Sequence, residues 1–359
     1  MMADRSSAVV ERVAAEELDA LIITDPANIR YVTGFTGSNG TVLVRGSEIS
    51  LITDSRYSAW AEREISEHDA SVSVIIAPGA GRAQLRELVD GAGAVGLEAS
   101  HVSWSTADSY RSDFGEQTVR ATVGLIEGLR ELKSDSEVDS IRSAAAVTDR
   151  ALAILIKELV PGHSEKDVAR RLEQLMYDDA GVEPSFDIIV AGGPNAAKAH
   201  HQPGNRVLER GDLVIIDSGS TVDGYRSDMT RSFVLGQPTP QQQDMLDAVL
   251  VAQQAGVDAV GPGVGAADID AACRESLVEA GLAEFFTHGT GHGVGLEIHE
   301  APGVNSRATA TLTPGHVITV EPGVYIPDVG GVRWEDTVVV TPTGAEVLTR
   351  SPKQPVIEL

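Results

Sequence analysis

Two stretches of the chain repeat one pattern, and this repeat limits the possible folds more than any other feature of the sequence. Residues 211–219 (GDLVIIDSG) and 315–323 (GHVITVEPG) each run from a glycine through five residues rich in aliphatic and β-branched types to a carboxylate, a spacer and a second glycine. A short apolar run bounded by glycines is typical of a buried β-strand. The acid at its end, Asp217 or Glu321, then lies in or beside the core, where an ionised carboxylate is costly unless it is paired or bound to a metal.

A second acid follows each copy of the repeat. Asp228 stands in Asp-Met-Thr after the first copy, and Glu335 stands in Glu-Asp-Thr after the second. We therefore expect two matched β-hairpins that carry four carboxylates, an arrangement that suits a metal site. For either copy alone, the alternative is that the acid before Ser-Gly or Pro-Gly caps a turn. The duplication favours the metal site.

A segment rich in histidine and glycine lies between the two copies. Residues 287–300 (THGTGHGVGLEIHE) contain three of the nine histidines of the chain, His288, His292 and His299. The glycines disfavour a helix, so a loop or an extended strand is expected. A nucleotide site is disfavoured, because the segment lacks the Lys-Ser/Thr ending of a P-loop and its glycine spacing differs from the dinucleotide fingerprint.

The chemistry of these side chains indicates a class of metal. Four carboxylates and one imidazole form an oxygen-rich set that suits two divalent ions, manganese first, with cobalt, iron or zinc as alternatives. A cysteine cage is excluded, because Cys273 is the only cysteine. A two-metal centre of this kind activates a water molecule and polarises a carbonyl or phosphoryl oxygen.

The five candidate ligands stand in segments that resemble, in order and context, the ligand motifs of the pita-bread metallopeptidases. The segments are DSG, DMTR, HGTGHGVG, VEPGVY and VRWEDT. The branch that the chain most resembles is that of the Xaa-Pro peptidases, aminopeptidase P and prolidase, because residues 28–35 (NIRYVTGF) are similar to a segment of that branch's N-terminal domain. The resemblance implies an α/β (α+β) fold, with an N-terminal creatinase-like α/β domain and a C-terminal pita-bread domain of two pseudo-symmetric halves.

The resemblance also implies a role for each ligand. Asp217 and Glu335 would bridge or chelate both metals, Asp228 would chelate one, and His292 and Glu321 would complete the other. Glu321 is in addition the expected general base, which would hold the proton of a metal-bridging hydroxide during its attack on the scissile carbonyl.

Four further residues are expected to contact the substrate. His288 and His299 would stabilise the oxyanion or orient the substrate, and each has the alternative of a histidine that is merely hydrogen-bonded in a polar pocket. His200 stands in a segment similar to the family's Asn…His-x-x-Pro loop. Arg333 could reach a substrate carbonyl or carboxylate, or it could be a surface arginine on a hairpin.

The expected reaction is hydrolysis of the N-terminal Xaa-Pro bond of a peptide, and the proline preference rests on the resemblance. Dipeptide-specific relatives have an arginine after the proline of this motif, whereas Pro302 is followed by Gly303 here. This difference favours an Xaa-Pro aminopeptidase over an Xaa-Pro dipeptidase, unless Arg307 or Arg333 compensates. A creatinase-like amidine hydrolase that needs no metal and a non-catalytic peptide-binding module remain as alternatives.

Length and composition suggest the organisation and exclude some partners. At 359 residues with 42% hydrophobic content, two domains are expected, at residues 1–128 and 129–359. The net charge of −25 disfavours nucleic acid and anionic membranes as partners. With one cysteine and neither an export signal nor a long apolar run, we expect a cytoplasmic protein. The resemblance also implies a homodimer.

Periodicity predicts how helices and strands alternate along both domains. In the first domain we expect helices near 8–18, 55–65, 82–90 and 105–112, and strands near 20–24, 41–44, 49–53, 72–76 and 95–98. In the second domain we expect helix pairs at 136–159 with 165–180 and at 240–257 with 266–280, each pair followed by one acidic hairpin. Ser134 and Glu137 form the capping box that begins the first of these helices.

Overall fold

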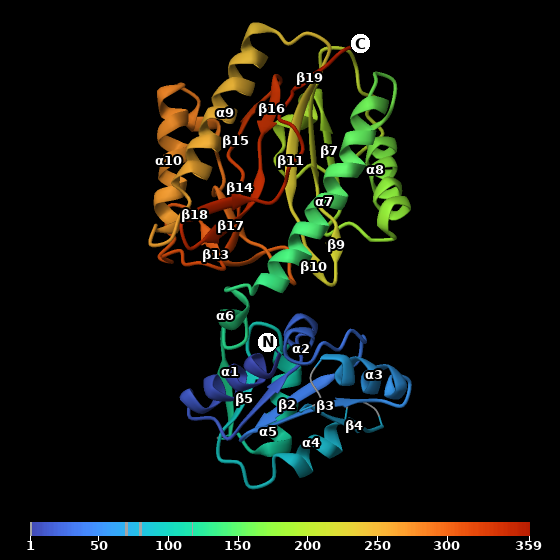
Figure 1. The fold of residues 1–359 in the computed structure, drawn as a ribbon, viewed down its shortest axis with the longest axis vertical. Helices are drawn as coiled ribbons and strands as arrows, with labels where there is room; N and C mark the ends of the chain where they lie inside the picture. Colours follow the sequence, from blue (N-terminus) through green and yellow to red (C-terminus); the bar gives the residue numbers. More distant parts are fainter. Residues whose placement is uncertain (1, 69–70, 79–80, 117) are drawn as a thin grey trace. The chain divides into compact units, whose positions relative to one another are not determined.

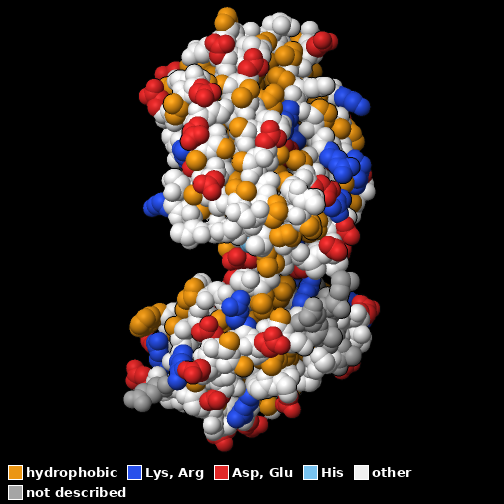
Figure 2. All heavy atoms as spheres, turned by 60° about the vertical axis from the view of Figure 1, so that its left-hand side comes forward, with side chains coloured by type: hydrophobic (Ala, Val, Ile, Leu, Met, Phe, Trp, Pro, Cys, Tyr) orange, Lys and Arg blue, Asp and Glu red, His pale blue; other side chains and the backbone are white. Residues whose placement is uncertain are grey.

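The computed structural model describes residues 2–68, 71–78, 81–116 and 118–359. The chain divides into two compact units, Met1–Arg130 and Glu131–Leu359, and each is described by itself (Figure 1). The expected domain limits of 1–128 and 129–359 stay a prediction. Acidic side chains are scattered over the visible face of each unit rather than gathered in one patch (Figure 2). None of the helices in the described ranges has the length and apolar character needed to cross a membrane.

The first unit is an α/β domain built on one mixed sheet. Over the residues that are described, the sheet has six strands in the order β4-β3-β2-β1-β5-β6. The β1–β2 and β2–β3 pairs are antiparallel, and the other neighbours are parallel. Its strands are β1 (Ala20–Ile23), β2 (Thr41–Arg45), β3 (Glu48–Thr53), β4 (Ser73–Ile76), β5 (Val95–Glu98) and β6 (Val119–Thr122). The helices are α1 (Met2–Ala15), α2 (Pro26–Thr33), α3 (Ser58–His68), α4 (Arg82–Leu88), α5 (Trp104–Phe114) and α6 (Glu127–Arg130).

Helix α2 is an element that the periodicity did not predict. Its signals are local: the side chain of Asp25 accepts a hydrogen bond from the backbone N–H of Ala27, Pro26 occupies the first turn, and Gly34 ends the helix with a φ of 73°. An acidic N-cap, an early proline and a glycine in the left-handed region are standard helix boundaries. The helix has only eight residues, which is too short for a periodic pattern to stand out.

The second unit begins with a half that carries the first acidic hairpin. Helices α7 (Asp135–Glu158) and α8 (Glu165–Ala180) precede β7 (Ile189–Gly192), the 3₁₀ helix η1 (Gly193–Ala197), β8 (Leu213–Ser218) and β11 (Met229–Leu235). These strands and β19 (Val356–Ile357) form a sheet in the order β19-β11-β8-β7. The helices and the sheet share a core that includes Leu152, Leu172 and Phe233.

The other half of the second unit repeats this plan. Helices α9 (Pro240–Ala259) and α10 (Ala266–Glu279) are followed by η2 (Ala283–Phe285), β12 (Gly291–Gly293), β13 (Glu300–Val304), β14 (Val317–Val320), β17 (Asp336–Thr341) and β18 (Gly344–Val347). The sheet order is β13-β12-β14-β17-β18, and its core includes Leu246, Ile269 and Trp334. Figure 1 shows α7 and α8 along one side of the strands, with α9 and α10 along the other.

The repeat extends to the connection inside each hairpin, although the sequence did not predict this. A small antiparallel ribbon lies between the two acids of each half: β9 (Thr221–Val222) with β10 (Tyr225–Arg226), and β15 (Gly323–Ile326) with β16 (Gly330–Arg333). The register of the acids differs between the hairpins. Asp217 lies inside its ladder opposite Thr230, whereas Glu321 and Glu335 lie just beyond the terminal pair of theirs, Val320 and Asp336.

Candidate metal centre

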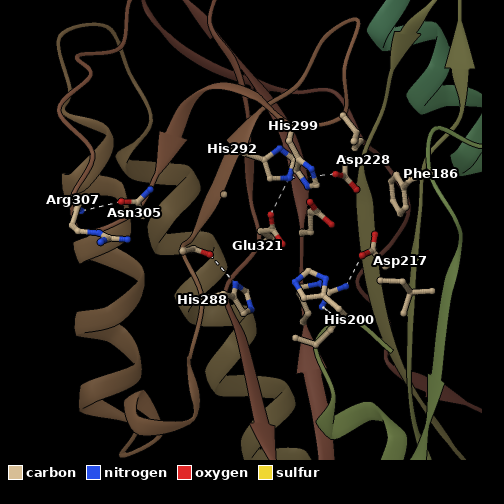
Figure 3. A pocket seen from close by; sticks show the side chains of 17 residues that line it. Phe186, His200, Asp217, Asp228, His288, His292, His299, Asn305, Arg307 and Glu321 are labelled. Carbon is tan, nitrogen blue, oxygen red and sulfur yellow. Dashed lines mark hydrogen bonds and ion pairs between the residues drawn. The ribbon is translucent and has the colours of Figure 1, made fainter. Parts of the chain in front are cut away.

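One pocket brings together all nine site residues that the sequence predicted. It has a volume of about 450 Å³, and its walls come from both halves of the second unit. The predicted residues that line it are His200, Asp217, Asp228, His288, His292, His299, Glu321, Arg333 and Glu335. Figure 3 shows His292, Glu321, Asp228 and Asp217 around a common space.

Three carboxylates form the centre of the pocket. Asp217 lies in β8, Asp228 directly precedes β11, and Glu335 directly precedes β17. One oxygen atom from each side chain lies within 4.8 Å of the corresponding atoms of the other two. Residues from two separate hairpins thus converge at a spacing that allows them to share a metal ion.

His292 and Glu321 extend this cluster. The Nε2 atom of His292 lies 3.3 Å from Oε1 of Glu321 and 3.6 Å from Oδ2 of Asp228. Its Nδ1 atom lies 3.0 Å from the carbonyl oxygen of Gly293. Since a carbonyl only accepts, a proton belongs on Nδ1, which leaves Nε2 as the ring nitrogen that faces the acids and that would bind a metal ion.

Two of the carboxylate oxygens are left unpaired by the described part of the chain. Oδ1 of Asp217 and Oε1 of Glu335 are buried and have no hydrogen-bond partner among the described residues. Buried acceptors are rarely left in this way, since each costs free energy comparable to a lost hydrogen bond. A bound divalent cation would satisfy both oxygens, so these residues fit the metal ions that the sequence predicted.

The pKa values of the acids also indicate that the cluster binds cations. Burial raises the pKa of Asp228 and of Glu335 well above the usual range, and the neighbouring carboxylates raise both further. Burial also raises the pKa of Asp217, although the charge of Arg333 opposes this. Without a cation these acids therefore cannot all ionise at neutral pH. Divalent cations bound to the cluster would supply the positive charge that lets these acids ionise.

Glu321 differs from the other acids because the hydrogen bond and charge of His292 lower its pKa. Burial alone would raise the pKa of Glu321, but the hydrogen bond and charge of His292, together with the charge of Arg333, lower it to about 2. Glu321 in turn raises the pKa of His292 against the effect of burial. Glu321 thus carries its charge throughout the neutral range.

A hydrogen-bonded chain engages both ring nitrogens of His288. The Nδ1–H group donates to the carbonyl oxygen of Gly289 (2.8 Å), and Nε2 lies 2.9 Å from the hydroxyl of Tyr325. Nε2 carries no proton in this tautomer, so the tyrosine hydroxyl donates to it. Burial lowers the pKa of His288, which keeps the ring neutral. His288 thus has no N–H left for a substrate, and the geometry favours the alternative of a histidine that is hydrogen-bonded in a polar pocket.

Arg333 is a buried residue that supports the acids. Its guanidinium donates to Oδ2 of Asp217 (2.5 Å), to the hydroxyls of Tyr325 and Thr230 (2.9 Å each) and to the carbonyl of Ala199 (3.2 Å). Thr230 donates onward to Glu335 at 2.6 Å. The alternative of a surface arginine is wrong, since Arg333 is only 3% exposed.

His200 and His299 are the two predicted histidines with free ring nitrogens. Neither has a hydrogen-bond partner within the described ranges. The ring of His299 packs edge-on against that of His292, with 4.4 Å between centroids. Next to His299, Glu300 forms a buried ion pair with Lys133 at 2.9 Å, which anchors the segment. These two imidazoles are therefore free to contact a ligand in the pocket.

Sequence reasoning missed the hydroxyl groups that orient the ligands. The hydroxyl of Thr230 donates to Glu335, and that of Tyr325 donates to His288. The hydroxyl of Thr319 donates to Glu321 at 3.1 Å. For two of these hydroxyl groups, the spacing in the sequence already indicated a position beside a metal ligand. Thr230 follows Asp228 by two residues and Thr319 precedes Glu321 by two, and residues two apart on a strand share a face.

Comparison with known proteins identifies the family. Residues 139–342 match the model of metallopeptidase family M24, and residues 5–132 match the creatinase/prolidase N-terminal domain. The chain belongs to metallopeptidase family M24. The resemblance to the Xaa-Pro peptidase branch and the expected two-part fold, with a creatinase-like domain before a pita-bread domain, are thereby confirmed. A dependence on divalent metal follows from the family.

Several M24 relatives match over nearly their whole length. The chain is 33% identical to the Xaa-Pro dipeptidase of Pyrococcus furiosus over 354 residues, which cover 98% of this chain and 99% of that protein. The structure of Xaa-Pro dipeptidase from Bacillus anthracis is similar with a TM-score of 0.95, 35% identity and 99% of each chain covered. The structure of X-Pro aminopeptidase from Thermotoga maritima has a TM-score of 0.88 and 32% identity, with 97% of this chain and 100% of that chain covered.

Proposed function

We propose that the chain is a two-metal exopeptidase that hydrolyses Xaa-Pro dipeptides. The observation that carries this proposal is the acid cluster with its two unpartnered buried oxygens, set in a chain that is similar to Xaa-Pro dipeptidases along its full length. The sequence alone favoured an Xaa-Pro aminopeptidase. The relatives support that preference only in part and favour its alternative, the dipeptidase.

The metal ligands in this proposal are the five residues expected from the sequence. Asp217 and Glu335 would contact both ions, Asp228 one, and His292 and Glu321 the other. When bound, the ions would lower the pKa of a water molecule and polarise the scissile carbonyl. Manganese is the proposed metal, because the donor set is dominated by carboxylate oxygens.

The side chains around the cluster are proposed to have separate roles in catalysis and in substrate binding. Glu321 is the proposed general base, since its charged carboxylate lines the pocket beside the acid cluster. His200 and His299, whose ring nitrogens are free, are proposed to donate to the substrate carbonyl. Phe186, Ile189 and Ile298 also line the pocket and offer an apolar surface for a proline ring.

Arg307 is the proposed partner of the dipeptide's carboxylate. It lines the pocket together with Asn305, whose side chain accepts a hydrogen bond from the Arg307 backbone N–H at 3.0 Å (Figure 3). Arg307 is exposed and has no carboxylate partner among the described residues, whereas Arg333 is buried and engaged by Asp217. Arg307 is therefore the arginine of this pocket that is free to bind an anionic end group.

The residues around Arg307 also support a second candidate function, that of an Xaa-Pro aminopeptidase. Gly303 offers no side chain at the position where the resemblance implies an arginine in dipeptide-specific relatives, and no acid among the described residues pairs with the exposed Arg307. The similar structure from Thermotoga maritima is that of an X-Pro aminopeptidase. A longer peptide would extend past Arg307 without needing its charge.

An amide substrate separates these two candidates. A charge-assisted hydrogen bond contributes about 1.5–3 kcal/mol, so Arg307→Gln should raise the KM for Ala-Pro about tenfold or more. The KM for Ala-Pro-amide, which lacks the carboxylate, should change less than about twofold. Arg350→Gln is the matched control, since the Arg350 side chain is 71% exposed and pairs with Glu346. Equal effects of Arg307→Gln on both substrates would favour the aminopeptidase.

Two further proposals concern the state of the protein in the cell. A homodimer is proposed from the resemblance to the Xaa-Pro peptidase branch. A cytoplasmic location is proposed because Cys273 is the only cysteine and is buried, which suits a reducing compartment.

A further inference from the structure

His200 lies in a stretch of the chain that has no regular structure. After β7 and η1 the chain runs through residues 198–204 without helix or strand. We call residues 192–204 the His200 segment. His200 is exposed on this segment, has free ring nitrogens and lines the pocket. Its position must therefore be fixed by contacts that other residues of the segment make.

The side chain of Glu165 provides most of these contacts. Oε1 accepts hydrogen bonds from the backbone N–H of Gly192 at 2.9 Å and from Nδ2 of Asn195 at 3.0 Å. Oε2 accepts from Nε2 of His201 at 2.8 Å and from the backbone N–H of Gly204 at 2.9 Å. The four donors span the His200 segment from its first residue to its last, so this one carboxylate holds the whole segment in shape.

Glu165 is well suited to hold the segment rigidly. It is the first residue of α8 and is fully buried. Burial would raise its pKa, but the four hydrogen bonds outweigh this and lower it. The backbone N–H groups of Glu165 and Lys166 also donate to the carbonyls of Arg206 and Gly204. The start of α8 is thus joined to the segment through both side chain and backbone.

The two adjacent histidines of the segment have different partners. His201 is held by Glu165, whereas His200 lines the metal pocket. The residue before them is fixed as well, because the carbonyl of Ala199 accepts from Arg333. His200 therefore lies between two anchored neighbours, one tied to α8 and one tied to the arginine that supports Asp217.

We propose that Glu165 is a positioning residue, which together with His201 sets the place of His200 in the pocket. This inference rests on the proposed function for its kinetic test but not for its structural test. Glutamine at position 165 has the same shape as glutamate, but it presents an amide N–H₂ group in place of one acceptor oxygen. The backbone N–H of Gly204 or of Gly192 would then face a donor, which costs the segment a buried hydrogen bond.

Four single variants test the proposal, and each should be measured with its metal content. Glu165→Gln and His201→Phe remove bonds to the segment. His201→Gln is the conservative rescue, because its amide nitrogen can donate to Glu165. Asp167→Asn is the control, since Asp167 lies on the same helical turn and accepts hydrogen bonds from Ser164 rather than from the segment.

The structural measurement is amide hydrogen exchange of residues 192–204. Exchange at Gly192 or at Gly204, whichever amide faces the new N–H₂ group, should quicken about tenfold or more in Glu165→Gln, and both amides should stay within about threefold of wild type in Asp167→Asn. Bound metal should be unchanged in both variants. Unchanged exchange at these amides in Glu165→Gln, or a loss of metal, would overturn the proposal. This readout decides the question whatever reaction the protein catalyses.

The kinetic measurement is a double-mutant cycle with His200→Ala on Ala-Pro. Glu165→Gln should lower kcat/KM about tenfold or more in wild type but less than about threefold when His200 is already absent, since coupled residues are not additive. His201→Gln should retain most of the activity that His201→Phe loses. An equal loss in both backgrounds would show that Glu165 does not act through His200. A wild-type protein without activity on any Xaa-Pro peptide would instead contradict the proposed function.

Discussion

Arg333 holds one oxygen of Asp217 and leaves the other free: its guanidinium lies 2.5 Å from Oδ2, while Oδ1 is buried without a partner among the described residues. The same arginine reaches Glu335 through the hydroxyl of Thr230, and Oε1 of Glu335 is likewise left without a partner. Each of these two acids thus has one oxygen fixed by the protein and one available to a metal ion.

The first prediction concerns this arrangement. Arg333→Lys keeps the charge but cannot form the forked contacts to Asp217, Tyr325 and Thr230, so Asp217 and Glu335 lose their orientation. Metal affinity measured by isothermal titration should fall about 10- to 100-fold, as for other groups that orient metal ligands. Arg307→Gln, which removes a pocket arginine that does not touch the acids, should bind metal as wild type does. Equal metal affinity of Arg333→Lys and wild type would be inconsistent with this role.

The second prediction concerns the pH dependence of stability without metal. The folded-state pKa values of Asp228 and Glu335 are raised above their unfolded values, so the folded metal-free protein binds more protons than the unfolded chain. The stability contributed by the protonated acids is complete below about pH 4, their unfolded pKa, and is lost as pH rises through the raised folded pKa values. The loss approaches about 1.4 kcal/mol per pH unit for each acid.

Thermal unfolding of chelator-treated protein between pH 5.5 and 8.5 measures this effect. The melting temperature should fall as the pH rises, and manganese should flatten the dependence. Asp228→Asn is the control variant, and its metal-free slope should be smaller than that of wild type. A metal-free protein that becomes more stable toward pH 8.5 would rule out the protonated acid cluster.

The third prediction concerns a buried ion pair formed by Asp336, the residue that follows Glu335, with Arg231. Arg231 and Asp336 are 2.8 Å apart with side chains 1% and 2% exposed, and Arg231 also donates to the carbonyl of Glu335. Asp336→Ala leaves a buried guanidinium without its partner and should lower the free energy of unfolding by about 3–5 kcal/mol. Urea unfolding measures this loss. Asp139→Ala, which breaks the exposed pair with Arg142, should cost less than about 1 kcal/mol.

The fourth prediction separates a metallopeptidase from the alternatives without metal-dependent chemistry. Removal of metal with a chelator should abolish Ala-Pro hydrolysis, and added manganese should restore it, because bound ions would activate the water and polarise the carbonyl in the proposed reaction. Asp228→Asn should stay inactive after manganese is added. Hydrolysis that survives complete chelation would support the creatinase-like alternative.

Much of the catalytic unit was predictable from local patterns. The apolar runs that end at Asp217 and Glu321 form β8 and β14, and the acids that follow them return to the same pocket. The capping box of Ser134 and Glu137 begins α7 as expected, with the Ser134 backbone N–H donating to Glu137 at 2.8 Å. These features depend on neighbours in sequence, which is why sequence patterns reveal them.

The parts that could not be predicted depend on contacts between distant residues. The state of His288 is set by Tyr325, which lies 37 residues further along the chain, and Arg333 is buried because it binds Asp217 across the interface of two hairpins. Within residues 287–300, where a loop or an extended strand was expected, the strand β12 is limited to Gly291–Gly293, so His288 and His299 lie outside it. Helix α2 is the contrary case, because Asp25, Pro26 and Gly34 mark its ends locally, but its eight residues are too few for periodicity to reveal it.

The most direct test of the central claim is the specificity ratio of the manganese-loaded enzyme on Ala-Pro and Ala-Pro-Ala. A two-metal dipeptidase that binds the substrate carboxylate should show a kcat/KM for Ala-Pro at least about tenfold higher than for Ala-Pro-Ala, since a charge-assisted bond of about 1.5–3 kcal/mol is lost with the longer peptide. A kcat/KM for Ala-Pro-Ala equal to or above that for Ala-Pro would contradict the dipeptidase and restore the aminopeptidase.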